Sequence, residues 1–262
     1  MLTDHAHAGL LSPFHFHRVF REVTSATPAR FLTALRMSEA QRLLIHSGLR
    51  VSDICASVGY LSSGTFTTQF TRLVGVSPRE FRLVVQRHGD RSLVDCVPGL
   101  PDPDRPTDHP AGDAPHAEPD TPTGCLDGVV ESAAAGILFV GAFTNGIPQG
   151  TPLTCTVIAG PGPVRLPPAP DGDHHVLCVQ FTPGVTLAES LDPRHSCRLV
   201  GSTPGTVRVR RGRAAPFRIV LREPRPTDPP IVLALPVPAR RPAARRRAAS
   251  APVVPAARQP AG

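Results

Sequence analysis

Several residue types are scarce or missing in this chain. Its 262 residues include no tryptophan, no lysine and a single tyrosine, Tyr60, so all 28 basic residues are arginines. No apolar run approaches the roughly 18 residues needed to span a bilayer. The N-terminus also lacks the charged segment and apolar run of a signal peptide. These absences argue against a membrane-spanning helix and lead us to expect a cytoplasmic protein.

Six cysteines are scattered along the chain without any Cys-x-x-Cys pair. Such spacing argues against a zinc ribbon or a dithiol redox motif, because both need paired thiols. In a reducing compartment, isolated cysteines most often serve as small buried apolar side chains. We therefore predict neither a metal site nor a disulfide framework.

The net charge of +7 is unevenly distributed. Residues 1–87 carry 10 arginines against 5 acidic residues, whereas residues 88–123 carry 2 against 8. Residues 124–235 are nearly balanced, with 10 against 8, and residues 236–262 carry 6 arginines and no acidic residue. A basic first segment and a basic tail favour a polyanionic partner, most commonly nucleic acid.

An internal repeat with an offset of 50 residues marks the first third of the chain. Phe16, Phe20, Thr27-Pro28 and Phe31 reappear as Phe66, Phe70, Ser77-Pro78 and Phe81. Helix-start signals flank both copies: Ser12 before Pro13, Thr27 before Pro28, Ser62 or Ser63, and a capping box at Ser77–Glu80. Both copies therefore read as the second half of a helix-turn-helix unit.

Apolar residues at helical spacing indicate which faces are buried. We expect these side chains to face the helical core: Phe16, Val19, Phe20, Val23, Phe31, Leu32, Leu35, Leu43, Leu44, Val51, Ile54, Cys55, Val58, Phe66, Phe70 and Leu73. A short first helix is expected within Leu2–Ala8, and glycines are expected to end helices at Gly9, Gly48 and Gly59.

Beyond residue 123 the pattern changes to short apolar or alternating runs broken by glycine and proline, which is typical of a small β-sandwich or barrel. The expected strands are Gly136–Phe143, Leu153–Ile158, Val164–Leu166, His174–Phe181, Cys197–Val200, Thr206–Arg210, Phe217–Leu221 and Ile231–Leu235. The segment Val164–Val176 resembles the strand-turn-strand of carboxypeptidase-regulatory and prealbumin-like β-sandwiches.

The expected fold class is an all-α N-terminal domain, with tandem helix-turn-helix units joined by a linker helix, and a separate all-β C-terminal domain. Residues 1–87 form the first domain and residues 88–123 a Pro/Asp-rich disordered linker. Residues 124–236 form the β-rich domain, an effector or interaction module. Residues 237–262, rich in Pro, Ala and Arg, form a disordered tail that adds phosphate attraction or only solubility.

The face opposite each apolar stripe is available to DNA, since a helix-turn-helix places its second helix in the major groove. The candidate base-facing residues are Phe14, His15, His17 and Arg18 in the first unit, and Ser63, Gly64, Thr65 and Thr68 in the second. Arginine can bond guanine bidentately, and threonine hydroxyls can bond bases or phosphates. The candidate phosphate contacts are Arg21, Arg72, Arg79 and Arg82.

The segments Ser12–Phe20 and Ile54–Tyr60, followed by Phe66, Phe70, Gly75–Pro78 and Phe81-Arg82, resemble AraC/XylS-type transcriptional regulators over residues 2–86. The resemblance implies a seven-helix DNA-binding domain in which one long helix spaces two reading heads. It implies base-facing positions for Phe14, His17, Arg18, Ser63, Gly64, Thr65 and Thr68. It also implies a structural or phosphate-contacting role for Arg36.

Family members carry a further helix before the first unit, and this chain begins after that position. His5 stands where the family has an apolar residue, and Gly9 replaces a small apolar one. We expect either that translation starts upstream of Met1 or that the first unit is partly unstable.

We expect a DNA-binding transcription regulator and not an enzyme, with double-stranded DNA as partner. RNA polymerase and a small-molecule effector at the β domain are further candidate partners. No catalytic residue, cofactor or metal ligand is expected; His15 and His17, two apart on a helix, point to different faces, and His174 and His175 alternate faces of a strand. The alternative is a non-catalytic β-sandwich ligand- or protein-binding protein with a degenerate DNA-binding half.

Overall fold

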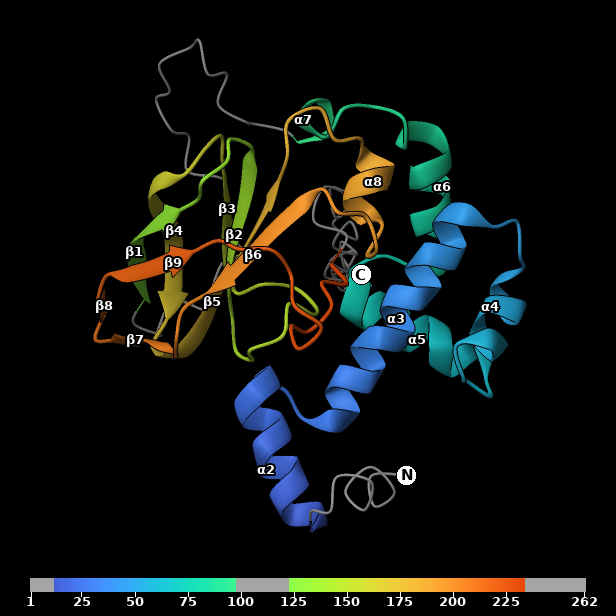
Figure 1. Cartoon of the computed structure of the whole chain (residues 1–262), viewed down its shortest axis with the longest axis horizontal. Coiled ribbons are helices and arrows are strands. Elements are labelled where there is room, and N and C mark those ends of the chain that lie inside the picture. Colours follow the sequence, from blue (N-terminus) through green and yellow to red (C-terminus); the bar gives the residue numbers. More distant parts are fainter. Residues whose placement is uncertain (1–11, 98–122, 234–262) are drawn as a thin grey trace, which may run out of the picture.

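The computed structural model describes residues 12–97 and 123–233 (Figure 1). The first range is helical: α2 (Pro13–Thr24), α3 (Pro28–His46), α4 (Val51–Ser57), α5 (Ser63–Val74), α6 (Pro78–His88) and α7 (Leu93–Cys96). The expected helix within Leu2–Ala8, the residues His5, His7 and Gly9, and the tail from residue 237 lie outside the described residues. Within those residues no helix is long and apolar enough to cross a membrane.

The four long helices begin where the sequence predicts. Ser12, Thr27, Ser62 and Ser77 are the N-caps, and each side chain accepts a hydrogen bond from a backbone N–H three residues on. Ser77 and Glu80 complete the capping box of α6. The one difference concerns Gly48, because α3 already ends at His46 with Ser47 as its C-cap.

The second helix-turn-helix unit has the core that its apolar stripe predicts. Phe66, Phe70 and Phe81 are fully buried, and their rings meet in tilted or edge-on pairs 5.7–5.8 Å apart. Edge-on aromatic pairs add about 0.5–1.5 kcal/mol to the burial of their area. Ile54, Cys55, Val58 and Leu73 are buried beside them in the same apolar cluster.

The first unit is more open than the stripe predicts. Val23, Leu32 and Leu35 are 59%, 49% and 47% exposed, so their assignment to the core was wrong. The buried side chains of α3 are Ala34, Met37, Ala40, Gln41 and Leu44. Leu44 was predicted to face the core, and the other four were not.

The second range is β-rich: β1 (Thr123–Glu131), β2 (Ile137–Phe143), β3 (Thr154–Ile158), β4 (Gly162–Pro170), β5 (Gly172–Phe181), α8 (Leu187–Leu191), β6 (Arg198–Ser202), β7 (Val207–Arg210), β8 (Arg213–Ala214) and β9 (Phe217–Val220). One sheet has the order β4-β1-β9, with β1 and β9 parallel. The other has the order β3-β2-β5-β7-β8, and β6 also pairs with β5. A shared core between the sheets includes Leu126, Leu166 and Ile219 of the first and Leu138 and Val176 of the second.

Seven of the eight expected strands correspond to observed ones, with ends shifted by a few residues. The expected strand Ile231–Leu235 was wrong for its described residues, because 231–233 form no strand. Strand β1, helix α8 and the short β8 had not been expected. Within the expected linker, α7 is present and Leu93 is fully buried; residues 98–122 lie outside the described part.

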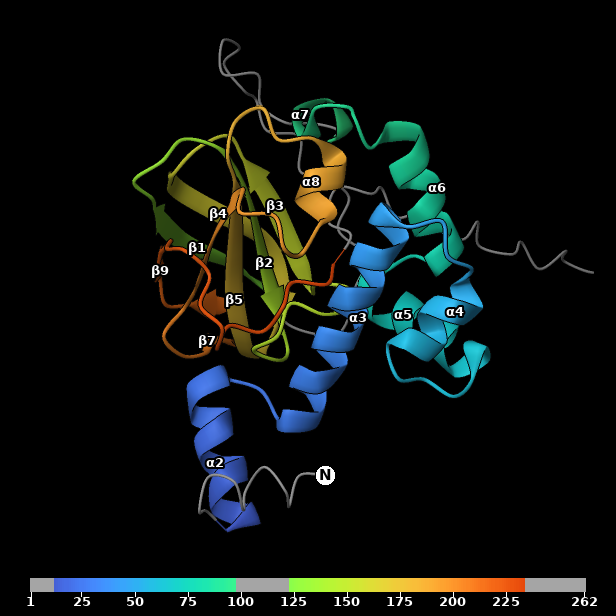
Figure 2. The ribbon, with the colours of Figure 1, turned by 45° about the vertical axis from the view of Figure 1, so that its right-hand side comes forward.

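The helices cover the outer face of the larger sheet (Figures 1 and 2). All seven residues of β2 are buried, because Leu138 and Val140 face the sandwich core whereas Ile137 and Phe139 face the helices. One apolar cluster therefore runs from α3 through β2 and β5 to α8. The helical and β-rich parts differ in fold class and share a continuous core.

Candidate DNA-reading surface and its support

The candidate base readers of the first unit lie along the outer side of α2. Phe14 is 83% exposed, and Arg18 is exposed beside the half-buried His15 and His17. Arg18 Nη1 donates to Glu22 Oε1 at 2.9 Å, and Nη2 lies 3.3 Å from His15 Nδ1. Phe14, His17, Arg18, Arg21 and Glu22 together line a shallow hollow of about 460 Å³.

The candidate base readers of the second unit lie at the start of α5. Ser63, Gly64, Thr65 and Thr68 are all exposed, and Ser62 Oγ accepts from Thr65 N. A methyl group built on Gly64 would meet only Ser62 Oγ, at 3.7 Å. The fold itself therefore has room for a side chain at position 64, although glycine in a helix costs about 1 kcal/mol relative to alanine.

The five candidate phosphate arginines differ in their surroundings. Arg21 and Arg79 are exposed, and the exposed Arg72 donates to Gln69 Oε1 at 3.0 Å. Arg36 instead lies over the Tyr60 ring at 5.7 Å, and Arg82 donates to the Leu49 carbonyl at 2.7 Å. Arg36 and Arg82 thus tie the turns at either end of α4 to the neighbouring helices.

The loop between β2 and β3, residues 144–153, is called the β2–β3 loop. It contacts α2 and α5, the two reading heads, at the ends opposite the candidate base readers. Gly146 packs on Ser25, the C-cap of α2, where an added methyl would lie 3.0 Å from Ser25 Cβ. Asn145 Oδ1 accepts from Arg30 Nη1 at 2.6 Å, and Gly150 N donates to Leu73 O in α5 at 2.9 Å. One loop of the β-rich part therefore joins α2, α3 and α5.

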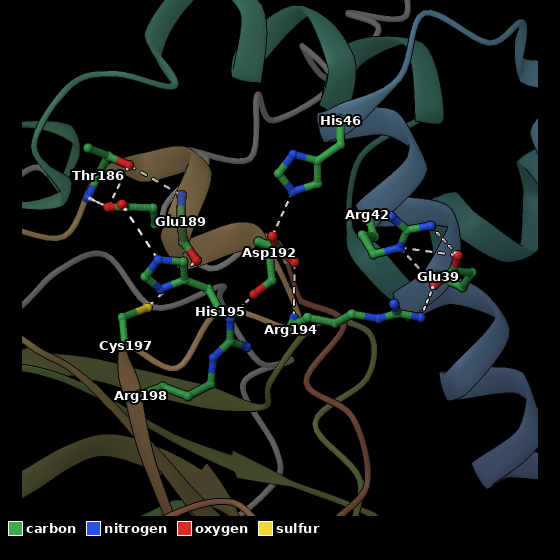
Figure 3. Close-up of polar contacts among 10 residues, drawn as sticks. All are labelled: Glu39, Arg42, His46, Thr186, Glu189, Asp192, Arg194, His195, Cys197 and Arg198. Atoms are coloured by element: carbon green, nitrogen blue, oxygen red, sulfur yellow. Dashed lines mark hydrogen bonds and ion pairs between the residues drawn. The ribbon is translucent and has the colours of Figure 1, made fainter.

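Polar contacts also join α3 to the segment around α8 (Figure 3). His46 Nε2 lies 2.6 Å from Asp192 Oδ2, and Arg194 Nη2 donates to Glu39 Oε2 at 2.9 Å. Arg42 adds a second partner for Glu39 at 2.6 Å. We call these five residues the α3–α8 clasp.

The charges within the clasp shift two carboxyl groups. The pKa of Glu39 is lowered mainly by its hydrogen bonds with Arg42, against an opposing effect of burial. For Asp192, burial alone would raise the pKa, but the hydrogen bonds from Arg194 N and His46 outweigh it and the net pKa is lowered. Both carboxylates are therefore stabilised in the ionised form by their partners.

Sequence reasoning missed the residues that join the two parts. Asn145, Asp192, Arg194 and the buried Gln41, whose Nε2 donates to Val232 O at 3.0 Å, carry no local motif. Their partners lie more than 100 residues away, so only the folded chain brings them together. The single signal in the sequence for such a contact was Gln41, a polar residue at an inward-facing position of α3.

Comparison with known proteins identifies the class of the helical part. Residues 6–83 match the sequence family described as helix-turn-helix domain. The chain is 43% identical over 65 residues to the HTH-type transcriptional activator RhaR of Cronobacter sakazakii, covering 25% of this chain and 23% of that protein. It is 44% identical over 66 residues to the activator RhaS of Escherichia fergusonii, covering 25% and 24%.

The matching region spans about a quarter of each of these relatives. Two solved structures align with part of the chain at 30% identity and a TM-score of 0.31: the C-terminal domain of AraT, a response regulator from Geobacillus stearothermophilus, and the DNA-binding domain of AdpA in complex with target DNA. They cover 32% and 31% of this chain, and 69% and 74% of their own. The sequence match over residues 6–83 shows that the N-terminal part of the chain contains a helix-turn-helix domain.

Proposed function

We propose that this protein is a sequence-specific transcription regulator that places α2 and α5 in two successive major-groove segments of double-stranded DNA. The observation that carries the proposal is the pair of capped helices, each with exposed candidate readers on its outer face. Successive major grooves on one face of B-DNA lie about 34–36 Å apart, and α3 separates the two heads.

The proposed roles of the residues follow from their exposure and chemistry. Arg18 would bond guanine, Phe14 would pack on a thymine methyl or sugar, and Thr68 would bond a base or phosphate. His15, His17, Ser63, Gly64 and Thr65 complete the base-facing set. Arg21, Arg72 and Arg79 would contact phosphates first, because they are exposed, whereas Arg36 and Arg82 are half-buried and contact Tyr60 and the Leu49 carbonyl.

The similarity to two transcriptional activators supports RNA polymerase as a second partner. We propose that the protein acts at the nucleoid in the cytoplasm. The same similarity speaks against the alternative, a β-sandwich binding protein whose helical half no longer binds DNA. A small-molecule effector at the β-rich part would fit the contact between the β2–β3 loop and both reading heads.

The test begins with selection of bound sequences from a random double-stranded DNA library by the full chain. We expect enrichment of a two-part site, and then a loss of about 1–3 kcal/mol in binding free energy for Arg18→Ala with relaxed preference at one base pair. Arg165→Ala is the matched control, since Arg165 lies on β4 and pairs with Asp127 of the adjacent strand β1. Absence of any enriched sequence would overturn the proposed function.

A further inference from the structure

A cleft of about 1300 Å³ lies between the helices and the outer face of the larger sheet. Its roof is one side of α3, formed by Phe31, Leu35, Ser38 and Glu39, together with the end of α2. The long segment after β9 forms a further wall, from Arg222 to Leu233. Val23 and Leu35, which are about half exposed and are not core residues of the first unit, both line this cleft.

The strand register gives the floor of the cleft. Cys155, Gly141, Leu177 and Ser202 lie side by side across β3, β2, β5 and β6, and all four line the cleft. Gly141 is buried on the floor, and its neighbours on the same side of β2 are Phe139 and Phe143. A side chain there would come within 3.0 Å of the Phe143 ring.

One end of the cleft holds a buried cation without a carboxylate partner. Arg198 is only 8% exposed, and no carboxylate of residues 12–97 and 123–233 lies within 4.0 Å of its guanidinium. Its Nη2 donates to the Asp192 carbonyl, its carbon Cζ lies 5.7 Å from the Phe181 ring centre, and Nε has no partner. The other arginines at this end, Arg194 and Arg222, are paired with Glu39 and Asp228.

A buried charge of this kind is costly unless something neutralises it. Burial lowers the pKa of the Arg198 guanidinium, which reflects the same desolvation. His195 adds a second group at this end, since its Nδ1 is buried and has no partner (Figure 3). The cleft thus has a partly apolar floor and roof and one end at which the buried Arg198 has no carboxylate of the described residues within 4.0 Å, with Glu189 3.6 Å from His195 Nε2 and the Asp192 carboxylate acting on Arg198 from a greater distance.

We propose that this cleft binds a small molecule made of an apolar body and one carboxylate. The carboxylate would lie against Arg198 and His195, and the apolar body would extend past Gly141 toward Phe143. The opposite end of the cleft includes Gly146 and Pro148 of the β2–β3 loop, so the bound molecule would contact the loop that joins both reading heads.

Binding can be measured with a single fluorophore, because the chain has no tryptophan. Leu35→Trp places one on the roof of the cleft at a half-exposed position, so little core packing is lost. The probes are octanoate, octan-1-ol as its uncharged counterpart, and acetate as the head group alone. We expect saturable emission changes with octanoate at concentrations about 10-fold or more below those needed for octan-1-ol, as a charged hydrogen bond implies.

Two further variants in the Leu35→Trp protein locate the site. Arg198→Met should reduce octanoate affinity to that of octan-1-ol, and Ser202→Phe should weaken both by filling the cleft from an exposed position. Arg165→Met, an arginine on the other sheet, should leave both unchanged. Equal affinity for octanoate and octan-1-ol in the Leu35→Trp protein would overturn the proposal even if Arg198→Met failed to fold.

The coupling of this cleft to the reading heads rests on the proposed function. The expected result is a change of at least about 5-fold in DNA affinity at saturating octanoate, the lower end of ordinary coupling between sites. The fluorescence measurement contains no DNA. A protein that takes up octanoate as described and never binds DNA would refute the proposed function and leave the cleft assignment standing.

Discussion

At the scale of single residues, Arg18 is held on the outer side of α2 by Glu22 and His15, which would compete with DNA in the proposed complex. Its ion pair with Glu22 joins side chains that are 54% and 60% exposed. Solvent screens such a pair, so it adds little to the stability of the fold and opens at low cost. Glu22 also places a negative charge on the side of the helix that would face phosphates.

Replacing that carboxylate should therefore strengthen DNA binding. We expect Glu22→Gln to raise affinity for the selected sequence by about 2- to 5-fold, because it frees Arg18 and removes a repulsive charge. Fluorescence anisotropy at fixed salt measures the effect, and the melting temperature should stay within error of the parent. A weaker complex would show instead that Glu22 holds Arg18 in its binding rotamer.

Gly64 gives a prediction in which stability and binding change in opposite directions. The fold has space for a methyl group there, so Gly64→Ala should stabilise α5 by up to about 1 kcal/mol. If the backbone of α5 approaches DNA closely at this position, the same change should weaken binding about 10-fold or more. Thermal unfolding and anisotropy on one preparation test both, and a variant that gains stability without losing affinity would remove Gly64 from the interface.

At the scale of elements, α3 is the helix on which the others converge. Its inward residues pack on the second unit, its polar residues form the α3–α8 clasp, and Phe31 and Leu35 roof the cleft. Because the second unit, the α8 segment and the cleft lie on different sides of α3, its apolar residues do not fall on a single stripe. The prediction that Leu32 and Leu35 are core residues assumed one buried face, whereas Leu35 lines the cleft and Leu32 is 49% exposed.

The capped helices and the second core could be predicted because their signals are local. Ser62, Ser77 and the phenylalanines at 66, 70 and 81 act within a few residues of each other or at helical spacing. Strand β1 was missed because Gly124 and Gly128 interrupt its apolar pattern, although Leu126 and Val130 are buried. A methyl at Gly128 would lie 2.5 Å from the Phe217 ring, so the parallel pairing with β9 requires that glycine.

The clasp predicts a dependence of stability on pH. The folded pKa of Asp192 is below its usual 3.8, so ionised Asp192 stabilises the fold above that value, and this contribution is lost as pH falls through the folded pKa. Asp192→Asn should lower the unfolding free energy near pH 6 by about 1–3 kcal/mol. The variant should also lose less stability than the parent between about pH 4 and pH 2.

Urea unfolding at a series of pH values measures this, with Asp127→Asn as the control. Asp127 pairs with Arg165 across an exposed sheet face, where both side chains are more than half exposed. Its replacement should change stability little at any pH. Parallel stability curves for Asp192→Asn and the parent would contradict the assigned role of the clasp.

At the scale of the whole molecule, most of the net positive charge lies towards the two ends of the chain. Residues 236–262 carry 6 arginines without an acidic residue. If they bind phosphates, deletion of 237–262 should reduce the slope of log affinity against log salt by about 0.9 for each phosphate that the tail neutralises in the full chain. A slope equal to that of the full chain would assign the tail to solubility alone. Arg79→Ala, which removes one proposed phosphate contact of the helical part, is the comparison variant.

In the proposed complex with DNA, the β2–β3 loop affects how much the spacing between the two half-sites can vary. Two reading heads on a flexible tether can follow half-sites that drift apart, but here Gly146 rests on Ser25 and Gly150 N bonds Leu73 O. One inserted base pair rotates the second half-site by about 34–36° around the duplex axis, given 10–10.5 base pairs per turn. A chain braced in this way should therefore recognise operators of a single spacing, and variants that loosen the loop should accept several.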